Sequence, residues 1–329
     1  MRWLKYIILL FVSFWWFAGC SPSLGKWLFE HHIIKDDYRY GDLYRMANLP
    51  KFRVLKEECE IQPVKKKALQ LIIAGDSFTE EGRIDQEMLA AEHFDRIRVD
   101  EQTFVKIDNQ LPQVLIIETV ERHVRERFSS KWRGLTLEEP ITAAADKVWY
   151  KKLLELRMPY NAELHESELF GFDFTMKIRE WKALLNHKLF NRVDPGVALN
   201  KSEEHLLYAL PTKPGISSAF ETISDIEIDS LVYYINEATV YYHNAGIEHV
   251  VLNIIPNKTS ILGTDLGEYN HLVQRIYSHP DLKAEVLNIY PAFNKMKASA
   301  YEIGDTHWSC TGQQLWVDEL NQLMLNLEE

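Results

Sequence analysis

Residues 68–77 read ALQLIIAGDS, and this stretch decides the fold. The apolar run that ends at Ala74 is short, continuous and stopped by Gly75, which is typical of a strand buried on both faces. Asp76 and Ser77 then follow at the carboxyl end of that strand. Open α/β sheets form their binding sites at this edge, so the same ten residues predict both a buried strand and a candidate site.

The pattern of strand followed by helix recurs along the chain. Further strands are predicted at residues 96–99, 114–117, 249–255 and 285–290, and helices at 118–128, 226–244, 268–278 and 311–327. Alternation of this kind favours a mainly parallel sheet. We therefore predict an α/β fold, a three-layer α/β/α sandwich.

The segment 129–225 differs from its surroundings, because it lacks a clear run of buried strands. It is predicted to be a mainly helical insertion with amphipathic helices around 143–156 and 174–190. The predicted organisation is a lead-in at 20–65, an α/β domain made of 66–128 and 226–329, and this insertion between its halves.

The N-terminus has the features of an export signal. Arg2 and Lys5 precede an apolar run, and the run ends at Ala18-Gly19-Cys20, which resembles a bacterial lipobox. Residues 1–19 are predicted to be a signal peptide, with Cys20 lipidated. The alternative is an uncleaved membrane anchor with an incidental cysteine. Both predict an exported chain tethered to a membrane and facing the periplasm or cell exterior.

Composition excludes several classes of protein. The chain has 329 residues, 46% of them apolar, which is enough for a sizeable core. Its formal charge is −11, and loss of residues 1–19 leaves 35 basic and 48 acidic residues, or −13. We therefore expect no nucleic-acid partner. The sequence has no HExxH, zinc-type Cys/His spacing, Walker loop or GxGxxG, so we predict neither a metal site nor a cofactor.

If Cys20 carries lipid, Cys59 and Cys310 are left as a pair. Two alternatives stay open: a disulfide formed in an oxidising compartment, or two buried free thiols.

A second motif, GDTHWS at residues 304–309, follows the last predicted strand. A nucleophilic serine needs a base, and the base needs a carboxylate to fix its tautomer. Asp305 and His307 can supply both to Ser77. Gly75 allows a tight turn, and the Ser77 N–H is a candidate oxyanion donor. Taken alone, the Gly75-Asp76-Ser77 motif is explained as a turn or helix cap, and the Asp305-Thr306-His307 motif as a loop. Because both motifs follow strands of one predicted sheet, together they favour a catalytic site.

Together these motifs resemble the SGNH hydrolase superfamily. Most members place two residues between the aspartate and histidine, whereas Asp305-Thr306-His307-Trp308 is similar to the SGNH-like domains of alginate and exopolysaccharide O-acetyltransferases. The segment 117–122 (IETVER) is similar to their Glu-x-x-Glu-Arg, and 255–258 (IPNK) to their strand-Pro-x-Lys. In the alginate proteins the Asp-x-His-Trp motif precedes Gly-Asp-Ser; here the order is that of ordinary SGNH enzymes.

The resemblance implies a flavodoxin-like sheet and a Ser77-His307-Asp305 triad that forms an acetyl-serine. Gly75 and Asp76 would support the nucleophile. Two readings are open for Glu118 and Arg122: substrate binding, or a structural ion pair or support role at the oxyanion site. Lys258 is assigned no chemistry. Trp308 either forms the floor of a sugar site or packs beneath the His307 loop.

The function implied is that of a polysaccharide O-acetyltransferase with an acetyl donor and a polysaccharide acceptor. A multi-spanning membrane acyltransferase is the expected partner. The alternatives are a carbohydrate esterase of the same fold and a catalytically silent polysaccharide-binding lipoprotein.

Overall fold

The computed structural model describes residues 2–21, 24, 27–28, 30–35, 37–60, 62–99, 103–108, 110–137 and 171–327. The chain divides into two compact units. The first comprises Met1–Leu55 and Ile141–Val193, and the second comprises Lys56–Pro140 and Asp194–Glu329. We call them the N-terminal unit and the sheet unit. These boundaries differ from the predicted ones, because residues 56–65 of the predicted lead-in and residues 129–140 and 194–225 of the predicted insertion belong to the sheet unit. Residues 194–225 were expected to be mainly helical, but they contain the paired strands Val197–Leu199 and Leu206–Tyr208.

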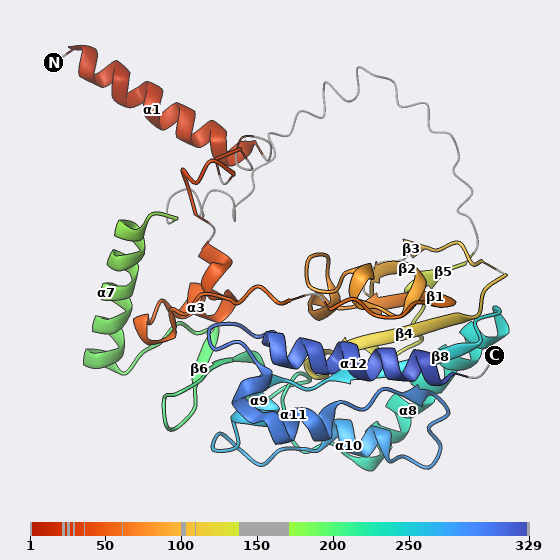
Figure 1. The fold of residues 1–329 in the computed structure, drawn as a ribbon. Coiled ribbons are helices and arrows are strands. Elements are labelled where there is room, and N and C mark those ends of the chain that lie inside the picture. Colours follow the sequence, from red (N-terminus) through yellow and green to blue (C-terminus); the bar gives the residue numbers. More distant parts are fainter. Residues whose placement is uncertain are drawn as a thin grey trace. The chain divides into compact units, whose positions relative to one another are not determined.

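A five-stranded parallel sheet forms the centre of the sheet unit (Figure 1). The strands lie in the order β2-β1-β4-β8-β9. Their bounds are β1 Lys67–Gly75, β2 Ala91–Arg98, β4 Gln113–Val120, β8 His249–Ile255 and β9 Glu285–Val286. All eight residues of the central strand β4 are buried, as expected for a sheet covered on both faces. The predicted α/β fold with a mainly parallel sheet is confirmed.

Helices flank this sheet (Figure 1). They are α4 Glu121–Arg127, α8 Asp225–Asn244, α9 Lys258–Leu262, α10 Leu272–Tyr277, α11 Tyr290–Met296 and α12 Cys310–Asn326. Two small sheets accompany them, β3 Thr103–Phe104 with β5 Leu135–Thr136, and the hairpin β6 Val197–Leu199 with β7 Leu206–Tyr208. The predicted helices at 226–244 and 311–327 correspond to α8 and α12.

Four predicted elements have wrong boundaries. The strand expected over 96–99 begins at Ala91, and the helix expected over 268–278 begins at Leu272. The helix expected from Glu118 begins at Glu121, because Glu118 still belongs to β4 and pairs with Asn253 of β8. The strand expected over 285–290 ends at Val286, and Tyr290 already starts α11.

Buried amides fasten helix α12 to the sheet. Trp316 Nε1 donates a hydrogen bond to Asn253 Oδ1 over 2.8 Å, and Asn253 Nδ2 donates to the carbonyl of Leu287 over 2.7 Å. Asn321 accepts from the N–H of Ala90 and donates to a neighbouring carbonyl. These bonds satisfy polar groups that would be costly to bury alone.

The N-terminal unit contains helices α1 Arg2–Cys20, α3 Asp42–Ala47 and α7 Asp173–Phe190. Tyr44 of α3 donates to Glu180 of α7 over 2.8 Å, and Arg53 pairs with the same carboxylate. The predicted helix at 174–190 is therefore confirmed by α7, whereas the one at 143–156 lies outside the described residues. Among the described helices, none combines the length and apolarity needed to cross a bilayer.

A disulfide joins Cys59 to Cys310 across 251 residues of sequence. Of the two alternatives left open by the sequence, the bonded pair is therefore the one found. Such bonds persist in oxidising compartments, which supports an extracytoplasmic location.

Removing this disulfide should destabilise the sheet unit. We expect the double variant Cys59→Ser/Cys310→Ser to lose about 3 kcal/mol of unfolding free energy, because the unfolded chain regains the freedom of a long loop. Urea denaturation measures this loss. Reduced wild-type protein is the matched control and should unfold like the variant; an unchanged midpoint in both would contradict the prediction.

Candidate active site

Three side chains from opposite ends of the sequence meet at the carboxyl edge of the sheet. Ser77 Oγ lies 2.8 Å from His307 Nε2, although the two residues are 230 positions apart. His307 Nδ1 lies 2.5 Å from Asp305 Oδ1, which also accepts a 3.0 Å bond from the His307 N–H. The structure thus brings together all three residues predicted for a catalytic triad, in the order a serine nucleophile requires.

The triad is sheltered from solvent and its carboxylate is ionised. Asp305 is 1% exposed and His307 7% exposed, whereas Ser77 is half-buried. Burial alone would raise the pKa of Asp305, but its bond to His307 and the ammonium of Lys56 hold that pKa far below its usual range. A buried aspartate that stays charged can orient the imidazole and stabilise its protonated form.

Lys56 is a member of the site that sequence reasoning missed. Its Nζ forms an ion pair with Asp305 Oδ2, the carboxylate oxygen that does not face His307. Cys59, three residues further on, is bonded to Cys310, and Cys310 Sγ lies 3.6 Å from the carbonyl of Glu57. The disulfide therefore holds the segment that carries Lys56 against the start of α12, close to the His307 loop.

The loop that carries Asp305 and His307 is anchored beside strand β8. Lys258, the first residue of α9, is 4% exposed. Its ammonium donates to the carbonyls of Glu302, Ile303 and Asp305 over 2.7, 3.1 and 3.1 Å. The three donors of the ammonium thus meet three carbonyls of one loop. The strand-Pro-x-Lys resemblance had marked Lys258 but gave it no role.

In the turn that carries Ser77, the backbone of Gly75 lies close to the side chains of Thr79 and Glu118. A Cβ atom at Gly75 would lie 1.9 Å from Thr79 Oγ1 and 2.9 Å from Glu118 Oε2, so any larger residue would displace these two side chains. Glu118 itself accepts bonds from the N–H of Asp76 over 2.7 Å and from the Thr79 hydroxyl over 3.0 Å. Of the two readings open for Glu118, the structure therefore places it in a supporting role beneath the nucleophile.

Asp76 and Glu118 are neighbouring carboxyls with opposite pKa shifts. Burial, followed by the charge of Asp76, raises the pKa of Glu118 to about 8. Burial also opposes ionisation of Asp76, but Arg127, 3.4 Å from Asp76 Oδ2, leads the positive charges that lower its pKa. At neutral pH Glu118 is therefore mostly protonated and Asp76 is charged.

The cation beside Asp76 is Arg127, which the sequence did not indicate. Arg122, the residue singled out instead, has its guanidinium 5.6 Å from the centre of the Tyr208 ring. The Ser77 N–H lies 3.3 Å from Asp76 Oδ1, a long hydrogen bond. Its role as an oxyanion donor stays a prediction.

Trp308 does not offer a sugar-binding face, because it is 4% exposed. Its ring packs against Phe78 at 5.0 Å and against Trp316 at 5.4 Å between ring centres. Phe78 also contacts His307, with the ring centres 4.7 Å apart. The packing alternative therefore describes Trp308, which helps hold the His307 loop on the core.

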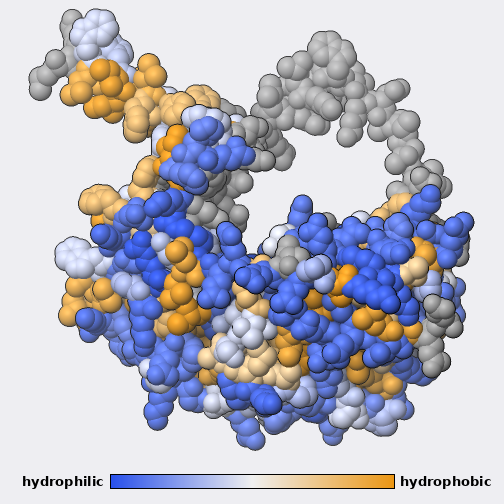
Figure 2. All heavy atoms as spheres, in the orientation of Figure 1, coloured by the Kyte–Doolittle hydropathy of each residue, from blue (hydrophilic) through white to orange (hydrophobic). Residues whose placement is uncertain are grey.

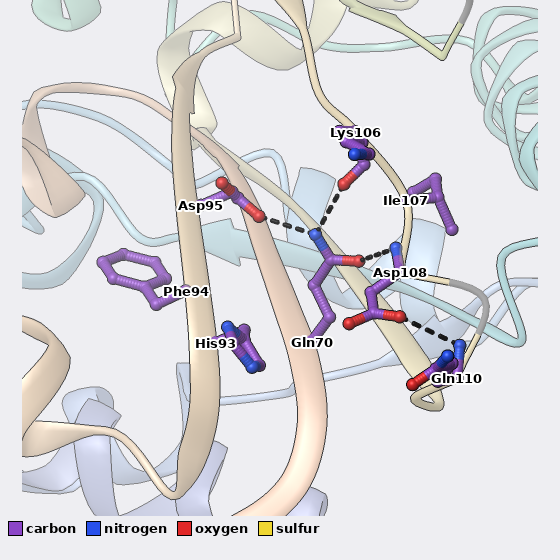
Figure 3. Close-up of a pocket in the computed structure, with 8 residues that line it drawn as sticks. All are labelled: Gln70, His93, Phe94, Asp95, Lys106, Ile107, Asp108 and Gln110. Carbon is purple, nitrogen blue, oxygen red and sulfur yellow. Dashed lines mark hydrogen bonds between the residues drawn. The ribbon is translucent and has the colours of Figure 1, made fainter.

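A pocket of about 450 Å³ lies away from the triad, toward the start of β1 (Figure 3). Gln70 projects into it and donates to Asp95 and to the carbonyl of Lys106, while its own Oε1 accepts from the N–H of Asp108. Figure 3 shows these bonds tying the loop around Lys106 to the first two strands. The side-chain amide of Gln70 is thus already hydrogen-bonded within the protein.

No protein-family model, curated protein or solved structure matches this chain.

The raised pKa of Glu118 predicts a pH-dependent stability. Glu118 keeps its proton in the folded protein above pH 4.5, where an unfolded glutamate loses it, and releases it near pH 8. Stability should therefore fall as pH rises through this window. Glu118→Gln keeps the accepting oxygen and removes the titration, so its unfolding free energy should fall less over the same range.

Urea unfolding across that pH range measures the difference. Glu126→Gln is the matched control, because Glu126 is exposed on the neighbouring helix α4, and it should follow the wild-type profile. Identical profiles for wild type and Glu118→Gln would contradict the prediction.

Proposed function

We propose that this protein is an exported, membrane-tethered SGNH-like O-acetyltransferase that modifies a cell-surface or extracellular polysaccharide. The observation that carries the proposal is the convergence of Ser77, His307 and Asp305, at 2.8 and 2.5 Å, from opposite ends of the sheet unit. Hydrogen-bond contact of this kind between serine, imidazole and buried carboxylate is the arrangement that serine acyl transfer requires.

In the first half of the reaction, Ser77 Oγ attacks the carbonyl carbon of an acetyl ester while His307 Nε2 takes the hydroxyl proton. Asp305 holds the imidazole through Nδ1–H and stays ionised. When the tetrahedral intermediate collapses, the ester C–O bond breaks and His307 returns the proton to the leaving oxygen. The product is acetyl-Ser77.

In the second half, His307 takes a proton from an acceptor hydroxyl, whose oxygen attacks acetyl-Ser77. The bond to Ser77 Oγ then breaks, and His307 returns the proton to the serine. A sugar hydroxyl as acceptor makes the protein a transferase, and water makes it an esterase. The resemblance of residues 305–308 to exopolysaccharide O-acetyltransferases favours the sugar, with a multi-spanning membrane acyltransferase as the source of acetyl groups.

Export is supported by two independent features. The Cys59–Cys310 disulfide suits an oxidising compartment, and Ala18-Gly19-Cys20 resembles a lipidation site. Lipid on Cys20 would tether the chain to a membrane.

Turnover of p-nitrophenyl acetate tests the triad. Ser77→Ala and His307→Ala should each lower kcat by about 10³-fold or more, and the double variant should lose no more than either, because the residues act as one unit. Asp305→Asn should cost roughly 10³- to 10⁴-fold, because it favours the wrong imidazole tautomer. Ser129→Ala, at an exposed serine of the same unit, should keep wild-type turnover. Full activity in Ser77→Ala would overturn the proposal.

Addition of an oligosaccharide acceptor separates the transferase from its alternatives. We expect acetylated oligosaccharide, detected by mass spectrometry, to accumulate with wild type and not with Ser77→Ala. Release of acetate alone across a panel of neutral and acidic acceptors would identify an esterase. Acceptor binding without any turnover would identify a silent binding protein.

A further inference from the structure

The charge of the chain is divided unequally between its two units. The N-terminal unit holds 17 Lys and Arg against 11 Asp and Glu, a formal charge of +6. The sheet unit holds 20 basic and 37 acidic residues, or −17. The net charge of −11 therefore conceals a cationic unit, which is the kind of surface that anionic lipid attracts.

Helix α7 of this cationic unit carries an exposed apolar stripe. Its members follow one another at intervals of three or four residues and are 42–73% exposed: Phe174, Ile178, Trp181, Leu185 and Leu189. At 100° per residue this spacing places them on one side of the helix. Met176 and Glu180, on the other side, are buried, so α7 already uses its inner face for the unit's own core.

Exposed lysines border the stripe. Lys177 and Lys188 fall on one side of it and Lys182 on the other, and all three are exposed. The acidic residues of α7 are Asp173 and Glu180. Asp173 forms ion pairs with Lys35 and Arg53, and Glu180 is buried. An apolar stripe flanked by lysines is the pattern of a helix that lies in the bilayer interface and directs its ammonium groups to the lipid head groups.

In the uncleaved chain, helix α1 adds apolar surface to the same unit; loss of residues 1–19 would remove it, and the stripe on α7 does not depend on it. Helix α1 is exposed at many apolar positions, with Leu10 at 73% and Ile7 at 65%. Its Trp15 ring stacks on Phe172, the residue that caps α7, with 6.0 Å between ring centres. Figure 2 shows apolar residues gathered over α1 and over α7.

We propose that the outer face of α7 is a membrane-docking surface that inserts its apolar stripe into the interface of an anionic bilayer. Charge complementarity selects this occupant, because the stripe lies between lysines on a unit of charge +6, or +4 once Arg2 and Lys5 are lost with residues 1–19. The surface acts in addition to any lipid on Cys20, and it does not depend on the catalytic proposal.

Co-sedimentation of the full chain with protein-free vesicles tests this surface. Binding to vesicles containing phosphatidylglycerol should exceed binding to phosphatidylcholine vesicles and weaken with salt. Ile178→Glu/Trp181→Glu, and separately Lys177→Glu/Lys182→Glu/Lys188→Glu, should each lower the partition coefficient on anionic vesicles about tenfold or more. Brominated lipid should quench part of the wild-type tryptophan emission, and Trp181→Phe should reduce that part.

Ile226→Glu/Tyr233→Glu is the matched control, because both residues are exposed on α8 of the acidic unit, and it should bind as wild type does. Circular dichroism and urea unfolding show that each variant is folded, and Ser77→Ala should bind vesicles normally, which separates this proposal from the catalytic one. The proposal is overturned if the α7 variants bind like wild type. It is also overturned if binding is lost only in native membranes, since α7 would then contact a membrane protein.

Discussion

One buried ammonium group holds the site in place. β9 is the outermost strand of the sheet, and Ser77 follows β1 on the far side of β4 and β8. The loop with His307 must therefore reach back across the carboxyl edge to meet the serine. Lys258 lies three residues after the end of β8, the strand between β9 and β4, and donates to three carbonyls of the loop. Arginine could not replace it, because a planar fork does not match three converging carbonyls.

The central strand fixes both halves of the site through two buried glutamates. Glu118, at the end of β4, accepts the N–H of Asp76 in the turn that precedes Ser77. Glu121, the first residue of α4, accepts the N–H of Asn257 over 2.8 Å, immediately before Lys258. Burial raises the pKa of each of these carboxyls. Residues 118–121 thus support the turn before Ser77 on one side and, on the other, the residue before Lys258, which anchors the His307 loop. A precisely positioned site needs this kind of support.

The sequence predicted what local pattern controls and missed what depends on distant contacts. Continuous apolar runs identified the buried strands, and the two motifs identified the triad because strand ends of a parallel sheet share an edge. Lys56 and Arg127 gave no signal, because each gains its role from a carboxylate far along the chain. The sequence predicted a helix beginning at Glu118, because a charged residue inside a fully buried strand is rare. Trp308 stayed ambiguous because composition does not show burial.

The division of charge changes how the site relates to its surroundings. A uniform charge of −11 would repel the whole chain from anionic lipid, so that only a covalent tether could hold it there. With +6 on one unit and −17 on the other, attraction and repulsion act on different parts of the same molecule. A covalent lipid limits how far the chain can move from the membrane, whereas the lysine-flanked apolar stripe of α7 would also set the orientation of the N-terminal unit on it. A charge of −17 disfavours contact of the sheet unit itself with anionic lipid. Under the proposed function, the same charge would disfavour a polyuronate and favour a neutral or zwitterionic acceptor.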